Sequence, residues 1–160
     1  DLDIKKRMEQ HFNSNFCLYH FSASLVHPNN FVEEGSFTFH RDSQPLGRFK
    51  VMVYLTDSQD KDSGPFQYLK GSHKTYNGLP QFGNSRYKNI KDEQVKTCTG
   101  TIGDAILFDN NGIHRGGRTK RGKRIALTAL YTASKTTTQE FYEANGFKSI
   151  GEKEWETSPS

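Results

Sequence analysis

The sequence predicts a mainly β protein, an all-β sandwich or barrel with short flanking helices. Most of the chain consists of short runs in which apolar and polar residues alternate, which is the period of a half-buried strand. Turn sequences rich in Pro, Gly and Asn separate these runs, and helical spacing of apolar residues occurs only near the two ends. Among all-β architectures, the jelly roll fits about eight strands with one open mouth.

The expected elements follow from these local patterns. Residues 1–12 carry apolar side chains at helical spacing, and residues 137–144 resemble a capped helix closed by Asn145-Gly146. The irregular segment 76–94, rich in aromatic and basic residues, is expected to act as a lid. The expected strands cover residues 16–26, 35–42, 48–56, 66–69, 95–99, 101–108 and 124–133.

Length and composition favour a single domain over residues 1–160. Twelve Phe, seven Tyr and one Trp supply core material, which excludes a disordered chain. The net charge of +4 does not by itself indicate a nucleic-acid partner, and no apolar run is long enough for a membrane span. Cys17 and Cys98 lie far apart in the sequence, so we expect neither a disulfide framework nor a zinc site, and we expect a reducing, cytoplasmic location.

A pair of candidate metal ligands lies in the run from Ser36 to Asp42. Side chains two apart on a strand point the same way, so His40 and Asp42 would share one face, roughly 7 Å apart along the backbone. An imidazole and a carboxylate at this spacing can converge on one metal ion, although a solvated strand end fits the same pattern. Either His73 or His114 is placed to supply a third ligand.

Two histidines and one carboxylate form the facial triad of non-haem Fe(II) oxygenases, although a zinc hydrolase can use the same ligands. Arg124 lies ten positions after His114, at the start of a predicted strand. Since arginine holds carboxylates in a bidentate fork, Arg124 beside an iron site would indicate 2-oxoglutarate as cosubstrate. The alternative is that Arg124 simply ends a basic surface run suited to an anionic substrate, formed by Arg115, Arg118, Lys120, Arg121, Lys123 and Arg124.

Several motifs then occur in a fixed order between residues 16 and 131. His40-Arg41-Asp42 comes first. It is followed by Val53-Tyr-Leu-Thr56-Asp57, Ser63-Gly64-Pro65-Phe66 and Gly71-Ser72-His73-Lys74, and then by Gly103-Asp104-Ala-Ile-Leu-Phe108-Asp109, His114 and Arg124. This series resembles the phytanoyl-CoA dioxygenase (PhyH) family of Fe(II)/2-oxoglutarate-dependent oxygenases.

The resemblance implies a double-stranded β-helix, the cupin-like jelly roll. It implies Fe(II) held by the catalytic residues His40, Asp42 and His114, with Arg124 binding the far carboxylate of 2-oxoglutarate and O₂ as the second cosubstrate. His73 would then be a structural residue of its turn. Relatives that halogenate replace the carboxylate ligand with a small residue, so Asp42 implies hydroxylation.

The expected function is therefore hydroxylation of a small-molecule metabolite, with release of succinate and CO₂. Members of the family act on acyl-CoA thioesters, amino acids, compatible solutes and other natural products, so the substrate itself stays open. Two departures are visible: Gly116 stands where members often carry a hydroxyl residue, and the helical region before the first strand is short. The alternatives are an oxygenase of a macromolecule, such as the AlkB-like repair enzymes, and an inactive jelly-roll binding protein with a vestigial metal site.

Overall fold

The computed structural model describes residues 2–28, 35–42, 48–75, 90–136, 140 and 143–144. It divides into two compact units, residues 1–18 with 132–160 and residues 19–131. Most of the expected lid, residues 76–89, and most of the expected helix at 137–144 lie outside the described residues.

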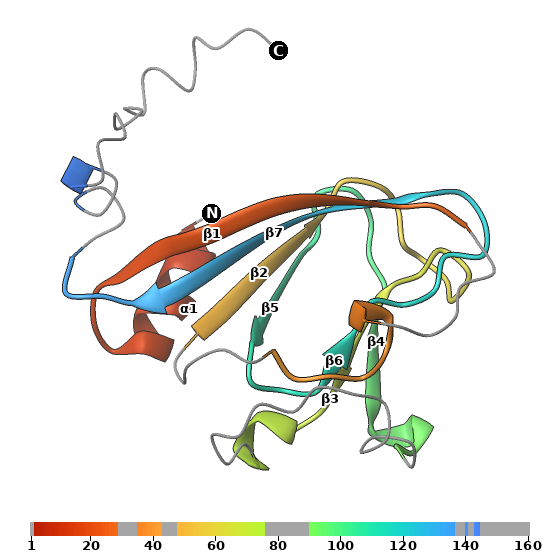
Figure 1. Ribbon diagram of the computed structural model, residues 1–160, viewed down its shortest axis with the longest axis horizontal. Coiled ribbons are helices and arrows are strands. Elements are labelled where there is room, and N and C mark those ends of the chain that lie inside the picture. The colour runs from red at the N-terminus through yellow and green to blue at the C-terminus, as the bar shows by residue number, and fades with distance from the viewer. Residues whose placement is uncertain are drawn as a thin grey trace, which may run out of the picture. The chain divides into compact units, whose positions relative to one another are not determined.

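Within the described residues, seven strands form two sheets (Figure 1). The first sheet has the order β1-β7-β2-β5, formed by β1 (Phe16–Val26), β7 (Arg124–Ala133), β2 (Arg48–Tyr54) and β5 (Ala105–Asp109). The second has the order β4-β3-β6, formed by β4 (Val95–Cys98), β3 (Phe66–Leu69) and β6 (His114–Arg115). The short strand β6 was not predicted, and the other strands lie within one or two residues of the predicted ones, except at 35–42 and 101–108.

The chain passes back and forth between the two sheets several times, in the manner of a double-stranded β-helix. β1 and β2 belong to the first sheet, β3 and β4 to the second, β5 to the first, β6 to the second and β7 to the first. His40, between β1 and β2, joins the second sheet through an antiparallel bridge to His114 of β6. The chain therefore crosses to the second sheet and back between β1 and β2, and the predicted all-β jelly-roll class is confirmed.

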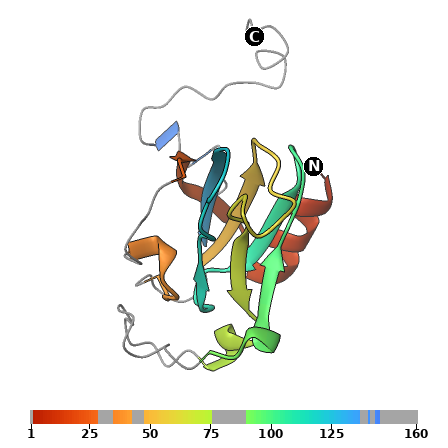
Figure 2. The same ribbon diagram turned by 90° about the vertical axis from the view of Figure 1, so that its right-hand side faces the viewer.

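Buried aromatic side chains from the two sheets contact each other, and Figure 2 shows the ribbons of the strands that carry them. Phe66 of β3 and Phe108 of β5 lie with ring centroids 4.6 Å apart and are 2% and 6% exposed. The buried hydroxyl of Tyr54 accepts the Phe66 N–H at 2.8 Å and donates to the Cys98 carbonyl at 2.7 Å. Burying such rings supplies the main stabilisation, and the hydroxyl does not go unpaired.

The predicted strand over residues 35–42 was wrong in its first half. Gly35–Phe37 form a single turn of 3₁₀ helix, and only His40 makes a strand bridge. Gly35 adopts a φ of +54°, which glycine tolerates, and both the amide and the hydroxyl of Thr38 donate to its carbonyl at 3.2 and 2.9 Å. This local capping competes with strand pairing, which the alternating pattern alone did not reveal.

The strand predicted from residue 101 begins only at Ala105. The Asp104 carboxylate accepts the Thr101 N–H at 2.7 Å, and Gly103 has a φ of +90°. Because Asp104 closes this turn, residues 101–104 do not take part in the strand pairing that begins at Ala105.

The unit that contains the chain ends includes helix α1 (Leu2–Phe12). An Arg7–Asp3 pair at 2.7 Å supports its exposed side, and the rings of Phe12 and Phe16 stack 5.7 Å apart just beyond its end. Within the part of the chain that the structure describes, no helix has both the length and the apolar character needed to cross a membrane.

Candidate metal centre

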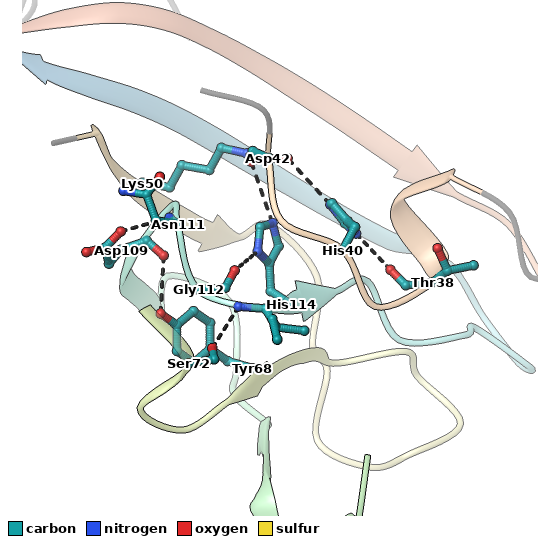
Figure 3. A network of polar contacts seen from close by, with 11 residues as sticks. Thr38, His40, Asp42, Lys50, Tyr68, Ser72, Asp109, Asn111, Gly112 and His114 are labelled. Atoms are coloured by element: carbon teal, nitrogen blue, oxygen red, sulfur yellow. Dashed lines mark hydrogen bonds and ion pairs between the residues drawn. The ribbon is translucent and has the colours of Figure 1, made fainter. Parts of the chain in front are cut away.

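Three predicted ligands meet between the sheets. One ligand atom each from His40, Asp42 and His114 lies within 4.8 Å of the others, and no other such group of three His, Cys, Asp or Glu occurs among the described residues. His40 Nε2 is 3.5 Å from Asp42 Oδ1, and His114 Nε2 is 3.6 Å from Asp42 Oδ2. The cluster therefore presents two imidazole nitrogens and a carboxylate toward one point (Figure 3).

The backbone brings the two histidines together. His40 N–H donates to the His114 carbonyl at 3.0 Å, and His114 N–H donates to the His40 carbonyl at 2.9 Å. The hydroxyl of Ser72, in the Gly-Ser-His turn, accepts the Ile113 N–H at 2.7 Å and so fixes the residue before His114. His73 takes no part in the ligand cluster.

Carbonyl groups set the orientation of both imidazoles. His40 Nδ1 lies 2.7 Å from the Thr38 carbonyl, and His114 Nδ1 lies 2.8 Å from the Gly112 carbonyl. A carbonyl oxygen only accepts, so each Nδ1 carries a hydrogen, and Nε2 is the ring nitrogen that each imidazole turns toward Asp42. Metal-binding histidines are held by this kind of outer hydrogen bond.

Lys50 of β2 completes the surroundings of Asp42. Its ammonium group contacts Asp42 Oδ2 (Figure 3), and the two side chains are 20% and 21% exposed. Burial would raise the pKa of the Asp42 carboxyl, but its contacts with His40, His114 and Lys50 outweigh burial and hold this pKa well below its usual range. Asp42 is therefore ionised at neutral pH and available as a ligand.

His114 is the most enclosed of the three ligands, with 4% of its surface exposed. The rings of Phe66 and Phe108 lie 5.6 and 5.2 Å from its ring. Burial lowers the pKa of His114 to about 4, although the Asp42 charge acts in the opposite direction. The imidazole is therefore neutral at physiological pH, which is the form that binds metals.

Arg124, at the first position of β7, is 6% exposed. Its Nη1 donates to the carbonyls of Gly64 and Gly117, the second at 3.4 Å, while its Nε has no hydrogen-bond partner among the described residues. A Cβ placed on Gly116 would lie 3.0 Å from Nη2. The guanidinium is thus fixed on one side by backbone and keeps a buried donor for an acceptor such as a carboxylate.

These features fit a bound divalent metal and an anionic chelator. The donor set is the two-histidine, one-carboxylate set typical of non-haem iron, both imidazoles are in the tautomer that offers Nε2, and the orphaned Arg124 Nε lacks an acceptor among the described residues. Such a centre can bind a bidentate cosubstrate and leave a further position for O₂.

Two neighbouring polar side chains have structural roles. Thr38 is buried and bonded to Gly35, and Tyr54 is bonded to Cys98 and Phe66. The Lys50–Asp42 ion pair was not predicted. The carbonyl contacts of Arg124 left no signal in the sequence, because every residue carries a carbonyl.

Comparisons with known proteins agree with this geometry. The family described as Phytanoyl-CoA dioxygenase (PhyH) matches residues 3–126, while a search of curated proteins gives no match. Among solved structures, HygX from Streptomyces hygroscopicus with nickel and 2-oxoglutarate bound has a TM-score of 0.60 at 19% identity. The match covers 86% of this chain and 64% of HygX.

Two proteins of nogalamycin biosynthesis share the fold. The non-heme alpha-ketoglutarate-dependent carbocyclase SnoK has a TM-score of 0.65 at 15% identity, over 93% of this chain and 65% of SnoK. The epimerase SnoN of the same cofactor class has a TM-score of 0.60 at 20% identity, over 81% of this chain and 54% of SnoN. The chain thus spans between about half and two thirds of these relatives, and the expected cofactors are confirmed at the level of the family.

Proposed function

Because the chain belongs to the phytanoyl-CoA dioxygenase family, we propose that it is an Fe(II)- and 2-oxoglutarate-dependent oxygenase that hydroxylates a small-molecule metabolite. Two observations carry this proposal: His40, Asp42 and His114 place their ligand atoms within 4.8 Å of one another, and the buried Arg124 has an unused donor.

Each residue then has a definite role. His40, Asp42 and His114 would hold Fe(II), and Arg124 would hold the distal carboxylate of 2-oxoglutarate. Bound Fe(II) and 2-oxoglutarate supply the oxidising chemistry, in which O₂ is consumed and succinate and CO₂ are released. Phe66 and Phe108 keep water from the His114 side of the centre, while the carbonyls of Thr38 and Gly112 hold the imidazoles in place.

Hydroxylation is the proposed outcome because Asp42 occupies the position at which a halogenating site needs space for a halide. The same cofactors serve a carbocyclase in SnoK and an epimerase in SnoN, so the outcome depends on how the substrate is held.

Anaerobic addition of Fe(II) and 2-oxoglutarate tests the proposal. The wild type should develop the weak visible charge-transfer band of the chelate, and a metabolite library should then be screened for hydroxylated products and coupled succinate release. Asp42→Ala should lose the band, whereas Lys123→Gln, an exposed residue of the basic run, should keep it. Absence of the band from the wild type at saturating metal and 2-oxoglutarate would support the vestigial binding protein instead.

A substrate that is cyclised or epimerised, without gaining an oxygen atom, would retain the class of 2-oxoglutarate-dependent enzymes and reject hydroxylation. Mass spectrometry of the substrate-derived product formed under ¹⁸O₂ separates these outcomes, because succinate takes up one labelled atom in every case and only hydroxylation also places label in the product derived from the substrate.

A further inference from the structure

A cavity lies on the outer side of the sheet that carries His114. Consecutive strand residues point to opposite faces, so His114 faces the metal centre and Arg115 faces away from it. The pairing on β3 agrees, since Tyr68 is opposite His114 and Gln67 is opposite Arg115. The cavity has a volume of about 190 Å³, and its described lining is Phe37, Lys61, Pro65, Gln67, Arg115, Gly116, Gly117, Arg118 and Lys120.

The charged side chains that line this cavity are positively charged. Among the described residues that line it are four basic side chains, Lys61, Arg115, Arg118 and Lys120, and no acidic one. The neighbouring Asp62 pairs with Lys120 at 3.2 Å, and that pair is largely exposed, so solvent screens it. Arginine and lysine gathered around one concave surface favour an anion, and arginine in particular matches the oxygens of a phosphate.

The cavity wall is held in place before any ligand arrives. Arg115 Nε donates to Gln67 Oε1 at 2.6 Å, and its guanidinium lies 4.1 Å from the centre of the Phe39 ring. Gln67 in turn donates to Thr97 Oγ1 at 3.2 Å. These contacts fix the direction of Arg115 and remove much of the entropy that ordering it on binding would otherwise require.

The loop that carries Lys61 and the loop that carries Arg118 and Lys120 are hydrogen-bonded to each other. Ser63 and Thr119 form an antiparallel bridge, and Lys120 N–H donates to the Asp62 carbonyl at 2.7 Å. A Cβ on Gly117 would overlap the Pro65 carbonyl oxygen, so the loops approach as closely as glycine permits. Lys61 and Arg118 are therefore carried on a joined pair of loops rather than on separate ones.

We propose that this cavity binds the phosphate group of a small phosphorylated molecule, with the basic side chains around the phosphate and the remainder of the ligand against Phe37 and Pro65. The volume exceeds that of a phosphate alone, which leaves room for an attached apolar group. Gly116 lines the cavity and also neighbours Arg124, since a Cβ at Gly116 would lie 3.0 Å from Arg124 Nη2, so the test has to distinguish an anion in the cavity from one at Arg124.

Calorimetric titration of the metal-free protein with phenyl phosphate, inorganic phosphate and benzoate tests the proposal. Phenyl phosphate should bind most tightly and benzoate most weakly. The double variant Lys61→Gln/Arg118→Gln, which changes two exposed side chains, should weaken phenyl phosphate binding at least tenfold. The matched control is Lys96→Gln/Lys123→Gln, which removes the same charge from two exposed lysines outside the lining and should change the affinity less than twofold.

Three results would overturn the proposal. One is the absence of binding by the wild type at millimolar phenyl phosphate. Another is equal weakening in the control double variant, which would mean that only net charge matters. The third is displacement of phenyl phosphate by saturating 2-oxoglutarate, which would place the anion at Arg124. Since no metal or turnover is required, failure here leaves the oxygenase proposal untouched.

Discussion

The ammonium group of Lys50 contacts the carboxylate of Asp42 inside the ligand cluster, from the opposite sheet to the one that His40 joins (Figure 3). Lys50 therefore neutralises Asp42 while the other carboxylate oxygen faces His40. This contact restricts the carboxylate to one orientation and limits how many of its oxygens are offered to a metal.

Replacing Lys50 by Met should weaken Fe(II) binding by about tenfold, because loss of an outer partner of a ligand typically has an effect of this order. Lys50→Arg retains the charge and a donor and should stay close to the wild type. Metal affinity is measured by anaerobic competition with a chromophoric chelator. Tighter binding in Lys50→Met would show that repulsion between the ammonium group and the metal is the larger effect.

Replacing Arg124 by Leu should raise the dissociation constant for 2-oxoglutarate by about 100-fold, as expected when one partner of a buried charged pair is removed. Metal affinity should change little, because Arg124 contacts the backbone of Gly64 and Gly117 rather than a ligand. Isothermal titration with each component separates the two effects. Equal loss of both affinities, with a shifted unfolding midpoint, would indicate a purely structural arginine.

Gly112 should not tolerate a side chain. A Cβ at this position would overlap the hydroxyl oxygen and the ring of Tyr68, and the Gly112 carbonyl orients His114. Gly112→Ala should lower the free energy of unfolding by about 1–3 kcal/mol, the usual effect of overpacking, and should also weaken metal binding.

Denaturant unfolding checks the Gly112 prediction. The double variant Gly112→Ala/Tyr68→Phe removes the nearest atom and should recover part of the lost stability. Gly116→Ala is the comparison, because its Cβ would come no closer than 3.0 Å to the nearest atom, Arg124 Nη2, and it should unfold nearer to the wild type. No difference between Gly112→Ala and Gly116→Ala would contradict the contact with Tyr68.

The stability of the metal-free protein should depend on pH through His114. Its pKa is about 4 when folded and near 6.5 when unfolded, so the unfolded chain takes up a proton first as the pH falls. The stabilisation from keeping His114 neutral is fully present above pH 6.5 and is lost as the pH falls toward 4, by about 3 kcal/mol.

The prediction is tested by comparing the pH dependence of unfolding in the wild type and in His114→Asn. Denaturant unfolding at several pH values between about 7 and 4 should show a steeper loss for the wild type than for His114→Asn, whose side chain does not titrate. Parallel curves for the two proteins would mean that His114 takes up its proton equally in the folded and unfolded states.

The sequence predicted the parts of the site that depend on residue type. His40, Asp42 and His114 are recognisable because few side chains bind metals, and the strands around them follow from alternation. The Lys50–Asp42 pair and the contacts of Arg124 depend on which distant segments lie side by side. The alternation of apolar and polar residues predicts which face of a strand a side chain occupies, but it does not predict which strands lie next to each other. These contacts can therefore be predicted only once the order of strands in the sheets is known.

The segment before His40 shows a different limit. Its alternating pattern predicted a regular strand, whereas the turn capped by Thr38 replaces the strand up to Phe37. The two ligands nevertheless converge with His114, because the bridge at His40 alone sets the position of the segment. The three predicted ligands thus lie together although the predicted backbone before them was partly wrong.

The reciprocal hydrogen bonds between His40 and His114 have a consequence for how the chain folds. The two residues are distant in sequence, so their pairing belongs to the long-range contacts that form against a large loss of chain entropy. The ligand nitrogens face one point only after that pairing exists. A metal ion would therefore bind the folded chain, in which the two histidines are paired, and not the unfolded chain. Metal binding would then stabilise the folded state and the pairing of these two segments.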